Sequence, residues 1–298
     1  MLLHTIALTA CPAAQQGVHD DTSVPPSPQL EDDGDRGPDR DSGCPTHVPY
    51  TASVRARVVD EHGAGLPDAR VQLCIWTNDG RMLCLEPGRA DAAGDVLIDV
   101  AEAARCMVSA TARVLLPQSR RPALYCAVEL AIDDASVTVT DPYLLLEAAA
   151  PSELPPLDDE AGARTVAFDG LALEVTPAAI GAEAYQRLAA AVLAPEQVPA
   201  CMAAAAPAFD LLVAFSPEGD VAGAGFPLAL DNTLALEPGA RIELFVQGGL
   251  ACTLGDGTLV EKAAWRSLGD AVVSADGARI EARGSAAVPC LGWLGLRR

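Results

Sequence analysis

The sequence is poor in lysine and in aromatic residues, and each shortage narrows the functions that it can support. Lys262 is the only lysine, and the acidic side chains outnumber the basic ones to give a formal net charge of -21. A nucleic-acid-binding protein needs a basic surface, so that class is excluded. Binding to an anionic membrane through charge is disfavoured for the same reason. Aromatic residues make up 4% of the chain, which is low for a surface that stacks ligands on rings.

The chain also lacks the residue groupings that catalysis and metal binding need. All four histidines lie in its first quarter: His4, His19, His47 and His62. A zinc site needs Cys and His at short spacing, and no CxxC pair is present. The glycine-rich stretch 219–225 has neither the lysine nor the following helix of a phosphate-binding loop. The sequence therefore predicts no enzyme, no metal and no cofactor.

An alternative interpretation is kept open for the C-terminal half. Two carboxylates in one cleft can make a hydrolase, and Asp210, Glu218 and Asp231 are candidates. Acidic residues are so frequent here that this pattern is weak. The alternative is therefore an exported hydrolase or inhibitor whose site lies in the C-terminal domain.

The segment Leu8-Thr9-Ala10-Cys11 combines an apolar residue, two small residues and a cysteine. It resembles the lipobox of bacterial lipoproteins, which implies that Cys11 carries the lipid and that residues 1–10 are a truncated signal peptide. A complete signal peptide begins with basic residues, and none precedes Cys11. The competing interpretations are a chance apolar start, or a cytosolic protein whose thiols are reduced.

Residues 11–49 have the composition of a disordered, acidic tether. They are rich in Pro, Gly, Ser and Asp, and cannot bury enough apolar surface to offset chain entropy. The stretch 32–41 has the Asp and Gly content of a calcium loop, but it lacks the regular ligand spacing and the closing Glu. Pro12 stands where an Asp commonly retains lipoproteins at the inner membrane. The lipoprotein resemblance therefore implies a cell-envelope location, with the outer membrane favoured.

The cysteine count indicates an oxidising compartment. Setting Cys11 aside leaves eight cysteines, an even number: Cys44, Cys74, Cys84, Cys106, Cys126, Cys201, Cys252 and Cys290. This parity fits an exported protein with disulfides. Cys106 and Cys126 lie on neighbouring predicted strands and form one candidate pair. If those two cysteines pair, one possible further bridge joins Cys44 to a cysteine of the second domain.

One disulfide follows from hairpin geometry. Asn78-Asp79-Gly80 is a turn signal between two apolar runs. If Asp79 is central, Thr77 faces Arg81 and Cys74 faces Cys84, with Gly80 at the position that needs a positive φ. Facing cysteines at a non-hydrogen-bonded pair lie close enough to be joined. We therefore predict a Cys74–Cys84 disulfide.

The fold class predicted is mainly β, in two domains. Short alternating strands separated by turns fill residues 50–147 and indicate a β-sandwich, with Val54, Ala56 and Val58 on one face. Residues 148–163 are predicted to be a linker. Residues 164–298 are predicted to be a second β-rich domain with one helix, at about 181–194, which ends before Pro195.

Two stretches of the first domain resemble a known family. Residues 58–73 (VVDEHGAGLPDARVQL) and 90–98 (ADAAGDVLI) are similar to the two signatures of carboxypeptidase regulatory-like domains. Asp68 replaces a glycine of that pattern, Ala90 a threonine and Val96 an aromatic residue. The resemblance implies a seven-stranded, prealbumin-like sandwich that is usually non-catalytic.

The second domain carries a weaker resemblance. Residues 265–284 are similar to a terminal hairpin in myxobacterial-type surface proteins. Together with the lipobox, these resemblances predict a lipid-anchored binding or scaffolding protein. Its expected partners are the membrane, through the anchor, and an envelope protein or surface ligand. The three tryptophans Trp76, Trp265 and Trp293 are expected to pack on sheet faces.

Overall fold

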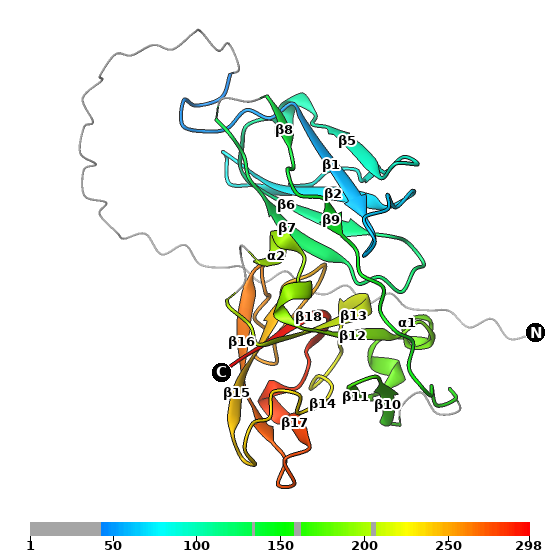
Figure 1. Cartoon of the computed structure of the whole chain (residues 1–298). Helices are drawn as coiled ribbons and strands as arrows, with labels where there is room; N and C mark the ends of the chain where they lie inside the picture. The colour runs from blue at the N-terminus through cyan, green and yellow to red at the C-terminus, as the bar shows by residue number, and fades with distance from the viewer. Residues whose placement is uncertain (1–42, 133–134, 158–161, 204–206) are drawn as a thin grey trace, which may run out of the picture. The chain divides into compact units, whose positions relative to one another are not determined.

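The structure is a computed structural model that describes residues 43–132, 135–157, 162–203 and 207–298 (Figure 1). Strands hold 46% of the described residues, which confirms the mainly β class. The lipidation candidate Cys11, the predicted signal peptide and most of the predicted tether lie outside the described residues. The end of the predicted 11–49 tether is attached to the first region: Cys44 is joined to Cys106, and the Met107 amide donates to the Pro49 carbonyl at 3.2 Å. No helix among the described residues has the length and apolar character to cross a membrane.

The first region contains two sheets that pack face to face, as the sandwich prediction requires. One sheet has the order β5-β1-β8, with β9 also paired to β1; its strands are β1 (Ser53–Val59), β5 (Asp95–Asp99), β8 (Ser136–Thr138) and β9 (Tyr143–Leu144). The other has the order β3-β2-β6-β7, with β4 also paired to β2; its strands are β2 (Arg70–Thr77), β3 (Met82–Cys84), β4 (Gly88–Arg89), β6 (Met107–Leu115) and β7 (Leu124–Val128). Val54, Ala56 and Val58 are buried in the core between the sheets, on the predicted face.

The two stretches that carry the family resemblance meet in space. Asp60 and Asp91 each accept two backbone N–H groups of the loop that follows them, at 2.8 to 3.0 Å. Gly94 has φ +83°, and a Cβ there would lie 2.2 Å from the Val58 carbonyl oxygen and 2.9 Å from the Cα of Gly65. This backbone contact explains why the position requires glycine. Asp68, which replaces a glycine of the pattern, also has a positive φ, of 67°.

The second region contains one nine-stranded, nearly closed, barrel-like sheet. Its order is β10-β11-β14-β17-β16-β15-β18-β13-β12. The bounds are β10 (Arg164–Phe168), β11 (Leu171–Val175), β12 (Ala189–Leu193), β13 (Leu211–Asp220), β14 (Leu228–Asp231), β15 (Arg241–Gln247), β16 (Trp265–Val273), β17 (Arg279–Ala282) and β18 (Cys290–Arg297). Apolar side chains from every strand fill its interior.

The segment that joins the two regions bridges both edges of this sheet. Ala149 exchanges two backbone hydrogen bonds of 3.0 Å with Ala190 of edge strand β12. Three residues later, the Ser152 amide donates to the Ala167 carbonyl of the other edge strand, β10, at 2.8 Å. Part of the predicted 148–163 linker therefore pairs with both strand edges that the sheet would otherwise leave open.

The helix predicted for 181–194 is wrong over most of its length. α1 spans Ala182–Gln186, and the following Ala-rich stretch forms β12, which pairs with β13 from Ala189↔Ser216 to Leu193↔Leu212. The alanines favour a helix by intrinsic propensity. Pairing with β13 and burial of Ala189, Ala190 and Leu193 outweigh that preference. A second short helix, α2 (Ala200–Ala203), and the final strand β18 were also not predicted.

The two regions share a core and belong to one compact unit. Trp293 of β18 and Phe245 of β15 pack in the same cluster as Leu124 of β7 and Leu73 of β2. The buried Trp293 indole donates to the Ala123 carbonyl at 2.8 Å. Of the three tryptophans, only Trp293 is fully buried, and Trp76 is 45% exposed.

Candidate functional site

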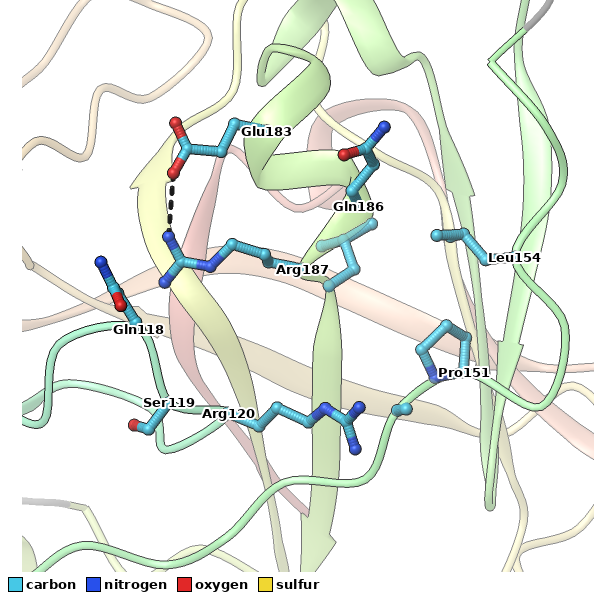
Figure 2. A pocket seen from close by; sticks show the side chains of 10 residues that line it. Gln118, Ser119, Arg120, Pro151, Leu154, Glu183, Gln186 and Arg187 are labelled. Carbon is cyan, nitrogen blue, oxygen red and sulfur yellow. Dashed lines mark hydrogen bonds and ion pairs between the residues drawn. The ribbon is translucent and has the colours of Figure 1, made fainter.

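A cavity of about 580 Å³ lies where the two regions meet. Three segments line it: the loop after β6, the segment that bridges the sheet edges, and α1 with the residues after it (Figure 2). Most of the lining side chains are polar: Gln118, Ser119, Arg120, Glu183, Gln186 and Arg187, beside Pro151 and Leu154. Its size is that of an ordinary small-molecule site.

Local hydrogen bonds fix the loop that brings Arg120 to this cavity. Gln118 has φ +59°, and the Ser119 hydroxyl donates to the Leu116 carbonyl at 2.7 Å and accepts the Arg121 amide at 3.2 Å. Arg121 turns away from the cavity and forms an ion pair with Glu61 at 2.7 Å. The two adjacent arginines therefore serve different roles: Arg121 fastens the loop, and Arg120 lines the cavity.

The opposite wall is held by α1. The Tyr185 hydroxyl donates to the Pro155 carbonyl at 2.8 Å, which ties the helix to the bridging segment. Arg187 pairs with Glu183 one turn earlier at 3.1 Å. Figure 2 shows the Arg120 guanidinium near Pro151, and no carboxylate pairs with it among the residues that the structure describes. The cavity is thus a locally cationic, donor-rich site in an acidic protein.

A second polar cluster lies on the face of the β2–β6–β7 sheet that points away from its own core. Arg113 of β6 donates to Glu218 of β13 through Nε at 2.8 Å and also through Nη2. The Tyr125 hydroxyl donates to the other oxygen of the same carboxylate. The Arg113 and Glu218 side chains are only 18% and 11% exposed.

The electrostatics of this cluster follow from its burial. Burial raises the pKa of the Tyr125 hydroxyl, and the adjacent Glu218 carboxylate raises it further, so the phenol stays protonated and donates. Burial alone would lower the pKa of Arg113, but the Glu218 carboxylate overrides it and raises that pKa. Glu218, a candidate hydrolase carboxylate, is therefore fully engaged in a structural ion pair.

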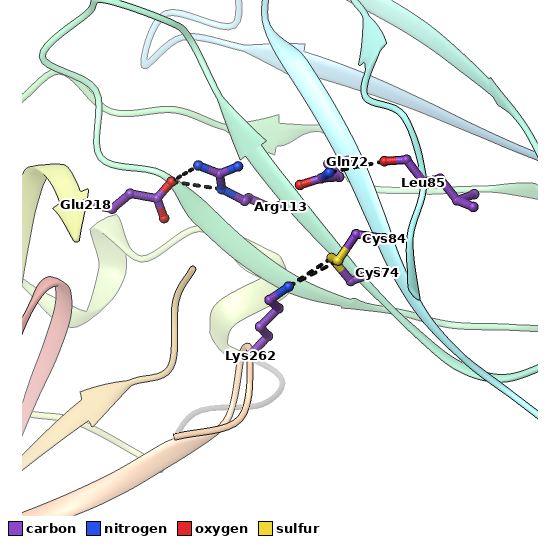
Figure 3. The surroundings of a disulfide bond; sticks show 7 residues. All are labelled: Gln72, Cys74, Cys84, Leu85, Arg113, Glu218 and Lys262. Atoms are coloured by element: carbon purple, nitrogen blue, oxygen red, sulfur yellow. Dashed lines mark hydrogen bonds and ion pairs between the residues drawn. A yellow bond between two sulfur atoms is a disulfide. The ribbon is translucent and has the colours of Figure 1, made fainter. Parts of the chain in front are cut away.

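Lys262 lies beside the Cys74–Cys84 disulfide on the same sheet face. Its Nζ is 3.2 Å from Cys74 Sγ and 3.1 Å from Cys84 Sγ (Figure 3). The loop carrying Lys262 approaches Gly248 so closely that a Cβ there would lie 2.0 Å from the Glu261 carbonyl oxygen. Gln247, the residue before Gly248 at the end of β15, donates through its side-chain Nε2 to the Tyr125 carbonyl of β7 at 3.2 Å.

Four disulfides use all eight cysteines other than Cys11. Cys74 is joined to Cys84 in the predicted register, with Thr77 and Arg81 hydrogen-bonded and Gly80 at φ +78°. The predicted Cys106–Cys126 pair is wrong: Cys106 is joined to Cys44, and Cys126 to Cys201. Cys126 points into the core, where α2 of the second region presents Cys201. Cys252–Cys290 completes the set.

The other candidate carboxylates are also occupied. Asp210 pairs with Arg298 at 2.6 Å, and Asp231 with Arg279 at 2.9 Å. Hydrogen bonding to Arg298 is the main cause that lowers the pKa of Asp210, although burial opposes it. Within the described ranges, no three His, Cys, Asp or Glu side chains gather as metal ligands would. The glycine-rich stretch 219–225 is a loop only in part: Gly219 and Asp220 end strand β13, and residues 221–225 lie in no strand or helix.

Arg120, Arg113 and Lys262 were not predicted to be important. Arg113 alternates with the buried Ala112 and Val114, so its position predicts a side chain on the other face of the strand, where solvent is expected. Lys262 stands out in the sequence as the only lysine, but the composition does not say which residues it contacts. Comparison with models of known protein families and with curated protein sequences found no match.

Proposed function

We propose that the chain is a lipid-anchored binding protein of the cell envelope that acts without catalysis. One observation carries the proposal: the four disulfides account for every cysteine except Cys11, the residue in the lipobox-like segment. Disulfides persist in oxidising, extracytoplasmic compartments. The leftover cysteine is thus the one whose sequence context is suited to lipidation. The anchor would hold the protein at a membrane, with the outer membrane favoured.

The intact mass of the protein made in a bacterial host from its complete reading frame, alkylated without reduction, tests the anchor and the compartment. We expect a chain that begins at Cys11, carries a diacyl or triacyl increment and has no alkylated cysteine. Cys11→Ser should abolish the increment and release the protein from the membrane fraction. An unprocessed chain with many alkylated thiols would contradict the proposal and favour a cytosolic protein.

The cationic cavity supports the binding role and indicates a small carboxylate as the ligand. Arg120 offers a guanidinium that pairs with no carboxylate among the described residues, and Gln118 and Gln186 offer further donors. A guanidinium binds a carboxylate through two parallel hydrogen bonds. The net charge of -21 repels anions at long range, so any preference for an anion must arise from this local contact.

A matched pair of probes tests the cavity by calorimetry. Succinate should bind more tightly than succinamide, which has the same shape but no charge. Arg120→Gln should weaken succinate binding about tenfold or more, because a hydrogen bond to a charged group contributes about 1.5–3 kcal/mol. Arg266→Gln, which removes an exposed charge elsewhere, should leave binding unchanged. Equal affinity for the two probes would refute an anion site here.

A further inference from the structure

The eight half-cystines differ in how far solvent reaches them. Cys84 is exposed, whereas Cys74 is buried with 4% of its surface accessible, and each of the other six is buried or half-buried. Thiol–disulfide exchange requires in-line access of a thiolate to one sulfur. Among the four disulfides, only Cys74–Cys84 therefore joins an exposed residue, on the side open to attack, to a buried residue whose sulfur would leave.

Lys262 places a cation beside this disulfide. Its ammonium is within 3.2 Å of both sulfurs, and no carboxylate pairs with it among the described residues. Burial lowers the pKa of Lys262, the Arg113 guanidinium lowers it further and Glu218 opposes both. An ammonium in this position interacts weakly with a neutral disulfide and strongly with a thiolate. Reduction would therefore supply the anion that Lys262 lacks.

We propose that Cys74–Cys84 is a thiol-exchange site, at which Cys84 is attacked by a small thiol and Lys262 stabilises the departing Cys74 thiolate. The attacking thiolate forms a bond to Cys84 Sγ, and the electron pair of the Cys74–Cys84 bond passes to Cys74 Sγ. A second thiolate then attacks the small-thiol sulfur of the mixed disulfide and releases Cys84. Two thiols lose two electrons and become a disulfide, and the protein gains two thiols after protonation by water.

Backbone and side-chain contacts fix Lys262 beside the disulfide. Gly248, the bond from Gln247 to Tyr125 and the backbone bond from the Ala263 amide to the Gly248 carbonyl at 2.9 Å fix the Lys262 loop over the hairpin. On the hairpin, the sulfurs are held by the Cys74↔Cys84 register. The Lys262 ammonium therefore belongs to the second region and the Cys74–Cys84 disulfide to the first, and the two lie together where these regions touch.

The test is site-resolved reduction of the full chain by glutathione at neutral pH. Samples are quenched with acid and alkylated, and the labelled cysteines are mapped by mass spectrometry. We expect Cys74 and Cys84 to be labelled at least tenfold faster than any other pair, and the first glutathione adduct to be on Cys84. Faster opening of another disulfide, or a first adduct on Cys74, would overturn the proposal.

Variants of Lys262 test the electrostatic part. Lys262→Met should slow reduction of Cys74–Cys84 about tenfold, because the leaving thiolate loses its cation. Lys262→Arg should retain most of the rate, and Arg266→Met is the control for loss of an exposed charge. The three other disulfides report folding in each variant, because they stay protected only while the fold is intact. An unchanged rate in folded Lys262→Met would remove Lys262 from the mechanism.

Discussion

Glu218→Ala is expected to lower the free energy of unfolding by about 3–5 kcal/mol. The substitution leaves the half-buried Arg113 guanidinium and the Tyr125 hydroxyl without their shared acceptor. A buried charge that loses its partner is far more costly than the same loss at the surface. Urea denaturation with the disulfides intact measures the change.

Two further variants distinguish the loss of an ion pair from the cost of leaving a buried charge without its partner. Glu281→Ala breaks the exposed Arg283–Glu281 pair of 3.2 Å and should cost less than about 1 kcal/mol. The double variant Arg113→Met/Glu218→Leu removes both charges, and it should be more stable than Glu218→Ala alone. Equal losses for Glu218→Ala and Glu281→Ala would show that the Arg113–Glu218 pair is effectively solvated.

Trp293→Ala is expected to cost about 3–5 kcal/mol, the loss usual for a large buried side chain. The indole fills the core that the two regions share and satisfies the Ala123 carbonyl. Trp293→Phe should cost less, because it keeps most of the volume and loses only the hydrogen bond. The shift in thermal unfolding midpoint measures both.

Trp76→Ala is the matched control for this prediction. Trp76 is a tryptophan of the same chain, but it is 45% exposed at a hairpin end. Its removal should change stability by less than about 1 kcal/mol. If Trp293→Ala shifted the midpoint no more than Trp76→Ala, the shared core would not hold the two regions together.

The sequence predicts features that depend on neighbouring residues. The Cys74–Cys84 bond follows from one turn, because the turn fixes which residues face each other. The pairing of Cys126 with Cys201 depends on α2 docking against β7, and no local pattern reports that contact. The assumption that neighbouring strands pair their cysteines therefore failed for Cys106 and Cys126.

The same distinction explains the errors in the second region. Residues 189–193 have local helix preference, and pairing with β13 makes them a strand. The Arg113–Glu218 pair joins residues 105 positions apart in the chain. The cavity likewise brings the loop after β6 beside α1. Arg120, Arg113 and Lys262 look like ordinary surface cations until those segments are assembled.

The bridging segment at Ala149 and Ser152 also decides how the chain can be divided. A fragment beginning at Arg164 would keep all nine strands but leave the edges of β10 and β12 unpaired at these positions. Unpaired strand edges recruit other chains, so such a fragment is expected to self-associate. In the full chain, by contrast, one copy could supply its 149–153 segment to the sheet of another, which would join two molecules by exchange of that segment. The stretch between the two regions is therefore a part of the sheet that this chain must supply to itself.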